Sequence, residues 1–145
     1  MNHKIAQQLL HNFISRAENI IGDNKLKQLW FNPDKYDGHI DKRLRLGHIS
    51  SKSDYEARTF EVLANASKIT IAIPPEGDMI SGKFQLVVDG WIVLVELGGK
   101  IITSYEFMQS KSTFEKNETE RGHKIYEHNI SAKDREILKR VFNLP

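Results

Sequence analysis

Residues 84–107 decide the fold, and they read FQLVVDGWIVLVELGGKIITSYEF. Two turn dipeptides, Asp89-Gly90 and Gly98-Gly99, divide this apolar, β-branched stretch into three short runs. Such dipeptides between extended runs are typical of tight hairpin turns. The stretch therefore predicts three consecutive antiparallel strands, and we expect their inner face to include Val87, Ile92, Leu94 and Ile101.

The sequence before this stretch has helical periodicity, and one alternating run lies between the helical part and the stretch. Apolar residues recur every three or four positions from Ile5 to Ile21, where Gly22 is expected to end the helix. Two further helices are expected, a basic one over 38–47 and one that a capping box at Ser51 opens. Residues 69–73 alternate as a strand that Pro74-Pro75 ends, and Ser131 is expected to cap a final helix.

These elements predict a single α+β domain over residues 1–145. We expect a helical layer over 1–66, an antiparallel sheet of roughly four strands over 67–108, a polar loop over 109–130 and a C-terminal helix over 131–145. N-terminal helices should pack on the sheet, and the C-terminal helix is additional.

The composition excludes several classes of protein. There is no cysteine among the 145 residues, which excludes a disulfide scaffold, a cysteine zinc site and a thiol nucleophile. No apolar run approaches the roughly 20 residues of a membrane span, and the first residues lack a signal-peptide core. We therefore expect no membrane association, and a location in the cytoplasm or delivery into the cytoplasm of a target cell.

Charge is unevenly distributed along the chain although the net charge is only +2. Residues 1–60 carry a formal +3, residues 61–110 a formal −3 and residues 111–145 a formal +2. Basic flanks around an acidic, apolar middle can form a phosphate-binding surface if the fold brings them together.

Known cofactor and metal motifs are absent. The chain has no GxxxxGK[ST], GxGxxG, HExxH or GxSxG sequence, so we expect neither a cofactor nor a metal. Asp89, Glu96 and Lys100 have the wrong spacing for a metal-dependent nuclease, and His123 with His128 fits a polar surface segment better than a metal motif.

Two short segments carry residues suited to phosphate chemistry. His39, Lys42 and Arg43 are one helical turn apart, so an acid–base histidine would share a face with two cations. On the last predicted strand, Thr103 and Tyr105 alternate with Ser104 and offer hydroxyl groups. A base, cations and a proton donor are what metal-independent RNA cleavage requires.

Together, the His-Ile-x-Lys-Arg helix and the Ile-Ile-Thr-Ser-Tyr strand resemble the ribonuclease superfamily that groups barnase, EndoU, colicin-type tRNases and RelE. The resemblance covers Gly38 to Phe107. It implies helices on a four-stranded antiparallel sheet, metal-independent cleavage of tRNA or other RNA such as mRNA, and a cognate immunity or antitoxin protein.

The resemblance also implies roles for individual residues. His39 would be the helix histidine, Lys42 or Arg43 the helix cation, and Arg58 on the next helix a second phosphate-binding cation. The strand hydroxyls would be those of Thr103, Ser104 and Tyr105.

A non-enzymatic binding module is the alternative. An immunity protein or phage accessory factor would need neither cofactor nor catalytic group. Its interface anchors would be exposed aromatic residues, for which the candidates are Trp30, Phe31, Tyr36 and Trp91.

Overall fold

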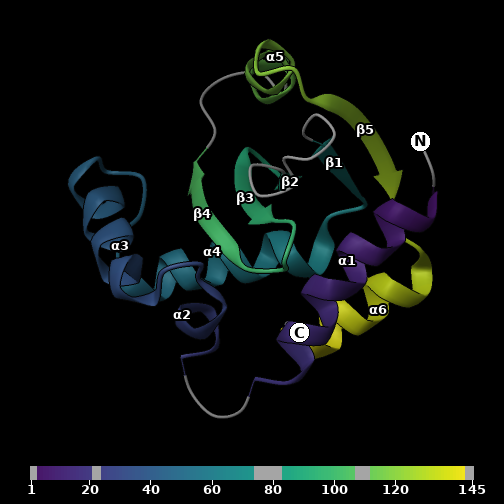
Figure 1. Cartoon of the computed structure of the whole chain (residues 1–145). Helices are drawn as coiled ribbons and strands as arrows, with labels where there is room; N and C mark the ends of the chain where they lie inside the picture. The colour runs from purple at the N-terminus through teal and green to yellow at the C-terminus, as the bar shows by residue number, and fades with distance from the viewer. Residues whose placement is uncertain (1–2, 21–23, 74–82, 107–111, 143–145) are drawn as a thin grey trace.

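A computed structural model describes residues 3–20, 24–73, 83–106 and 112–142. Its helices are α1 (His3–Glu18), α2 (Lys25–Leu29), the 3₁₀ turn η1 (Pro33–Lys35), α3 (Tyr36–Arg45), α4 (Lys52–Asn65), α5 (Ser112–Glu120) and α6 (Ala132–Val141). Its strands are β1 (Lys68–Ile73), β2 (Lys83–Val88), β3 (Trp91–Glu96), β4 (Ile101–Glu106) and β5 (Lys124–Asn129). The predicted α+β class is confirmed (Figure 1).

The five strands form one antiparallel sheet in the order β4-β3-β2-β1-β5. The turn between β2 and β3 places both Asp89 (φ 48°) and Gly90 (φ 78°) in the left-handed region, as a tight type I′ hairpin requires. The three consecutive strands predicted between residues 84 and 106 are therefore confirmed, and Phe107 lies outside the described residues.

One face of the sheet packs against α4 and α1, and α6 packs against both of these helices; the three lie together beneath the sheet in Figure 1. Phe84, on this face, meets the ring of Phe13 from α1 at 6.4 Å between centroids, and Phe13 stacks on Phe142 beyond α6. Val93 and Val95 of β3 belong to the same core.

The predicted inner face of the strands has the opposite parity, with one exception. Ile92 pairs with Tyr105 and Leu94 with Thr103, so these side chains and Val87 lie on the second face, away from the main core. A register shift between Leu94 and Val95 places Ile101 opposite Val95, and Ile101 therefore joins the core. Alternation alone cannot fix parity, because both faces of this sheet carry apolar residues.

Gly99 fits the turn between β3 and β4 against α1. Its φ is +93°, and a Cβ atom there would lie 2.9 Å from the backbone oxygen of Asn12. Only glycine combines this backbone conformation with so close an approach.

The predicted polar loop over 109–130 is wrong for the described residues of that range, which form α5 and β5. Strand β5 extends the sheet by pairing with β1 from Lys68↔Asn129 to Ile73↔Lys124, so the sheet has five strands and not four. The segment looks polar because β5 is an edge strand and because α5 buries a carboxylate, Glu118, in place of an apolar residue. Gly22, Pro74-Pro75 and residues 143–145 lie outside the described residues.

No helix in the described ranges has the length and apolar character needed to cross a membrane.

Candidate functional site

Helix α3 brings His39 to the edge strand β4. The side chain of Asn32 accepts a hydrogen bond from the amide of Asp34, and Pro33 follows this cap, so the chain enters the helical segment in a fixed direction. His39 Nδ1 lies 3.2 Å from Thr103 Oγ1, and its ring contacts Trp30 edge-on at 5.6 Å between centroids. The two segments that sequence analysis singled out are therefore in direct contact.

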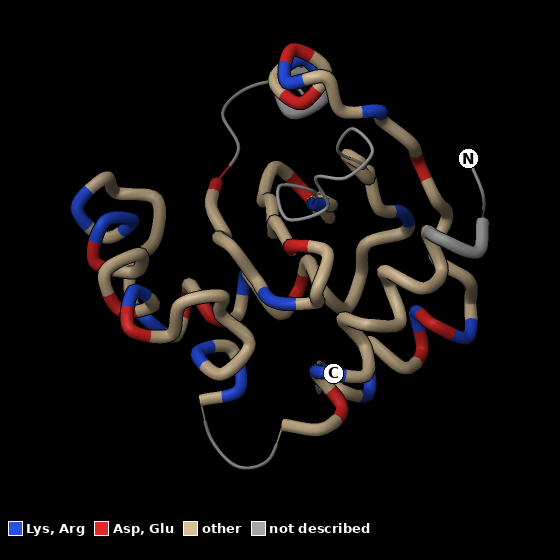
Figure 2. The backbone as a smooth tube through the Cα atoms, in the orientation of Figure 1, with Lys and Arg blue, Asp and Glu red and all other residues tan. Residues whose placement is uncertain are grey.

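A pocket of about 410 Å³ opens on this face of α3. Its lining consists of Asp34, Lys35, Gly38, His39, Lys42 and Arg43. In the described parts of the chain Lys35, Lys42 and Arg43 form no ion pair, whereas Lys27 and Lys52 both pair with Asp37. Figure 2 shows the basic positions of α3 beside β4. Three unpaired cations against one carboxylate make this pocket suited to an anion.

The surroundings of His39 favour its neutral form. Burial lowers the pKa of His39 below its usual value, and the cations Arg43, Lys42 and Lys35 lower it further. A neutral imidazole beside cations can accept a proton near neutral pH, which is the requirement for a general base.

Tyr105 lies beneath Arg43, whose guanidinium carbon is 5.2 Å from the centre of the tyrosine ring. Burial raises the pKa of Tyr105, and Arg43 offsets part of that effect. Neither Thr103 nor Tyr105 is among the residues that line the pocket. They adjoin it through His39 and Arg43, and so they support the two side chains that face the pocket.

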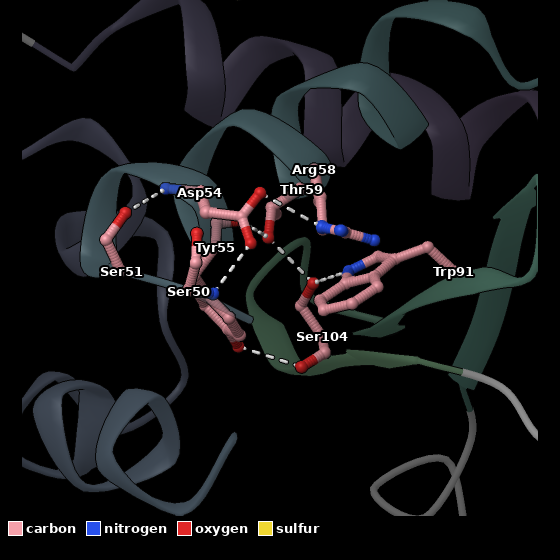
Figure 3. A network of polar contacts seen from close by, with 8 residues as sticks. All are labelled: Ser50, Ser51, Asp54, Tyr55, Arg58, Thr59, Trp91 and Ser104. Atoms are coloured by element: carbon pink, nitrogen blue, oxygen red, sulfur yellow. Dashed lines mark hydrogen bonds and ion pairs between the residues drawn. The ribbon is translucent and has the colours of Figure 1, made fainter. Parts of the chain in front are cut away.

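Ser104 does not share this surface. It is fully buried on the opposite face of β4, where its Oγ accepts a hydrogen bond from Trp91 Nε1 at 2.7 Å and contacts Thr59 Oγ1 at 2.7 Å (Figure 3). The hydroxyl of Tyr55 donates to the backbone oxygen of Ser104 at 2.9 Å. The predicted role of Ser104 as a substrate-facing hydroxyl is therefore wrong, because strand alternation turns it into the core.

Arg58 is engaged elsewhere on α4. Its Nε donates to Asp54 Oδ1 at 3.1 Å, and its guanidinium carbon lies 5.3 Å from the centre of the Trp91 ring (Figure 3). In the described structure no contact joins Arg58 to His39 or Tyr105. The role of Arg58 as a phosphate-binding group therefore stays a prediction, and Lys35 is the further cation that lines the pocket with His39.

Sequence reasoning missed Lys35 because it precedes α3 and ends the 3₁₀ turn that Pro33 begins, outside the helix expected over 38–47. The spacing of four from His39 is the signal that would have found it, since residues four apart share a helical face.

The four aromatic residues proposed as interface anchors of a binding module differ in their exposure. Trp30, Tyr36 and Trp91 are buried and pack around Tyr55, so these three are wrong as exposed anchors. Phe31 is 60% exposed. Large aromatic side chains are mostly buried in folded proteins, so burial is the common outcome for such residues.

His123 and His128 are also buried, against the expectation of a surface segment. His123 Nδ1 lies 3.0 Å from Glu118 Oε2, and Lys83 Nζ lies 2.7 Å from Glu118 Oε1. Within the ranges that the structure covers, no group of three or more histidine or carboxylate side chains is arranged to hold a metal ion.

A family model described as "Uncharacterised protein aq_aa01" matches residues 21–143, and the chain belongs to that family. The match spans every element from α2 to α6, including the residues that line the pocket on α3. No curated protein and no solved structure matches the chain.

Proposed function

We propose that this protein is a metal-independent endoribonuclease that cleaves tRNA or mRNA by attack of a ribose 2′-hydroxyl group. The observation that carries the proposal is the contact between Thr103 and His39, where His39 lines a pocket whose three cations have no ion-pair partner among the described residues. A cognate immunity or antitoxin protein would be the partner of such an enzyme.

His39 is the general base in this proposal. When Nδ1 donates to Thr103 Oγ1, the ring keeps its lone pair on Nε2, which is then available to the substrate. Nε2 takes the proton from the 2′-hydroxyl, the 2′-oxygen forms a bond to phosphorus, and the bond from phosphorus to the 5′-oxygen breaks. The products are a 2′,3′-cyclic phosphate and a free 5′-hydroxyl.

Lys35, Lys42 and Arg43 bind the phosphate. Negative charge accumulates on the phosphate oxygens as the fifth bond forms, and the cations that line the pocket stabilise that charge. Arg43 is held for this task by the ring of Tyr105. A tyrosine hydroxyl is protonated at neutral pH, and Tyr105 adjoins the pocket through Arg43, so Tyr105 is our candidate for the acid that protonates the 5′-oxygen.

The test is incubation of the purified protein with total RNA in EDTA. We expect cleavage without added metal and products that end in cyclic phosphate. A substrate with a single 2′-deoxy nucleotide at the cleaved position should be resistant, because the nucleophile is missing. Abolition by EDTA with rescue by magnesium would contradict the proposal.

Substitutions assign the roles. His39→Ala should lower cleavage by roughly 10²- to 10⁴-fold, the usual span for removal of an acid–base group. Lys42→Ala should also slow cleavage, and its matched control is Arg45→Ala, an exposed cation on the same helix that does not line the pocket. Tyr105→Phe keeps the ring beneath Arg43 and removes only the hydroxyl. A folded His39→Ala protein with full activity would end the assignment of the base.

A further inference from the structure

We propose that Phe31 and Lys100 form a binding site for an unpaired nucleobase, placed next to the phosphate pocket. The inference rests on the proposed ribonuclease function and adds to it a substrate class, single-stranded RNA. Phe31 precedes the segment that resembles known ribonucleases, so the resemblance assigns it no role.

The backbone fixes the position of Phe31. Trp30 forms a parallel β-bridge with Ile101, and the amide of Phe31 donates to the backbone oxygen of Ile101 at 2.7 Å. This short extension adds to β4 at the edge of the sheet, so successive side chains point to opposite faces. Trp30 is buried in the core beside Ile101, and Phe31 therefore points to the second face.

Thr103 and Tyr105 also point to that second face, as their pairing with Leu94 and Ile92 shows. Phe31, Thr103 with His39, and Tyr105 with Arg43 consequently follow one another along β4. Thr103 and Tyr105 are separated by about 7 Å, the length of two residues of a strand, and the hydrogen bond to Ile101 places Phe31 beside the start of β4. Thr103, which contacts His39, therefore lies between the start of β4, where Phe31 is bound, and Tyr105 further along the strand.

The exposure and charge around Phe31 favour a nucleobase over an apolar side chain. Phe31 is 60% exposed, and Lys100 Nζ lies 6.0 Å from the centre of its ring. Within the described ranges Lys100 forms no ion pair, so a cation and an aromatic surface are presented together. Base stacking on an aromatic ring beside backbone-binding cations is how proteins bind single strands, and a base stacked within a duplex cannot reach such a ring.

The test measures binding of a short, fluorescently labelled 2′-O-methyl oligoribonucleotide by anisotropy, because this ligand cannot be cleaved by 2′-hydroxyl attack. Phe31→Ala should weaken binding of the single strand by about 5- to 150-fold, the usual effect of losing one stacked base. Phe31→Trp should retain it. Leu46→Ala is the matched control, since Leu46 is 53% exposed at the end of α3 and should not affect binding. Binding of the same sequence as a duplex should be weak and equal in wild type and Phe31→Ala.

The outcomes separate this site from the ribonuclease proposal. If wild type cleaves RNA in EDTA and Phe31→Ala binds the single strand as tightly as wild type, the nucleobase site is refuted and the ribonuclease stands. If wild type binds the single strand through Phe31 without cleaving RNA, the ribonuclease proposal fails and the nucleobase site is supported. If wild type binds no RNA and Phe31→Ala instead loses a protein partner, Phe31 is a protein-interface anchor and the site is refuted.

Discussion

Ser104 shows how one hydroxyl can belong to the core while its sequence neighbours belong to a surface. Thr59 Oγ1 donates to the backbone oxygen of Tyr55 at 2.9 Å, so its proton is committed, and the hydroxyl of Ser104 must donate to Thr59 Oγ1. The hydroxyl of Tyr55 donates in turn to the backbone oxygen of Ser104. The three residues therefore close a ring of hydrogen bonds between α4 and β4 that is fully buried.

Ser104→Ala should consequently destabilise the protein without changing its chemistry. Trp91 Nε1 and Thr59 would each lose a partner away from water, at a cost of about 1–3 kcal/mol. Urea denaturation measures this loss. Thr103→Val is the comparison. It also removes one hydroxyl group, but from the half-buried second face of the sheet, and it should mainly slow cleavage. Equal stability of Ser104→Ala and wild type would contradict the ring of hydrogen bonds.

The lowered pKa of His39 makes a prediction about pH. The folded state binds a proton at His39 less readily than the unfolded chain, whose histidine pKa is about 6.5. The stability that neutral His39 contributes is therefore fully present above the pKa of the unfolded chain. It is lost as pH falls from there towards the pKa of His39 in the folded protein. Unfolding of wild type and His39→Gln across pH 5 to 8 checks this, and the variant should lose less stability on acidification. Parallel curves would contradict the lowered pKa.

At the scale of elements, α5 and β2 are joined by a buried charge. Glu118 is 3% exposed at its side chain and contacts Lys83 Nζ at 2.7 Å, and it also contacts His123. Lys83 pairs with Ala72 and Glu96 and so points to the second face, which places this end of α5 over that face. A polar helix can therefore be fixed to the sheet by one carboxylate.

Glu118→Gln should be strongly destabilising. It leaves Lys83, which is 18% exposed, without a compensating charge, and breaking a buried pair typically costs about 3–5 kcal/mol. The control is Glu18→Gln, which breaks the exposed pair with Arg140 and should cost at most about 1 kcal/mol. Urea denaturation of both variants measures the two losses of stability. Equal losses would show that the buried pair contributes no more than a surface pair.

At the scale of the whole molecule, a net charge of +2 predicts little general attraction to RNA, so binding should depend on the local cations. Three cations line the pocket, and contact with three phosphates of a single strand predicts a slope of log affinity against log salt of about −2. Lys42→Ala should make this slope shallower by about 0.7, whereas Arg45→Ala should leave it unchanged. Titrations at several salt concentrations measure the slopes, and a Lys42→Ala slope equal to wild type would remove Lys42 from the phosphate site.

The sequence by itself determined the order and type of most elements. Turn chemistry is local, so Asp89-Gly90 and Gly98-Gly99 identify the hairpins without knowledge of the rest of the chain. Helical spacing is local too, which is why His39, Lys42 and Arg43 were correctly predicted to share a face of α3. The hydrophobic pattern failed for α5 and β5, because their burial depends on the ion pairs of Glu118 and on pairing with a distant strand.

Only the tertiary structure decided which face of each strand meets the helices and which cations surround the histidine. The bulge beside Leu94 and Val95 and the apolar character of both faces leave strand parity undetermined in the sequence, and parity is what buries Ser104 and leaves Thr103 beside His39. Contacts between residues far apart in the chain likewise commit Arg58 to Trp91 and set Phe31 at the edge of β4. These choices follow from which packing buries most apolar surface, and that quantity belongs to the whole chain and not to any segment of it.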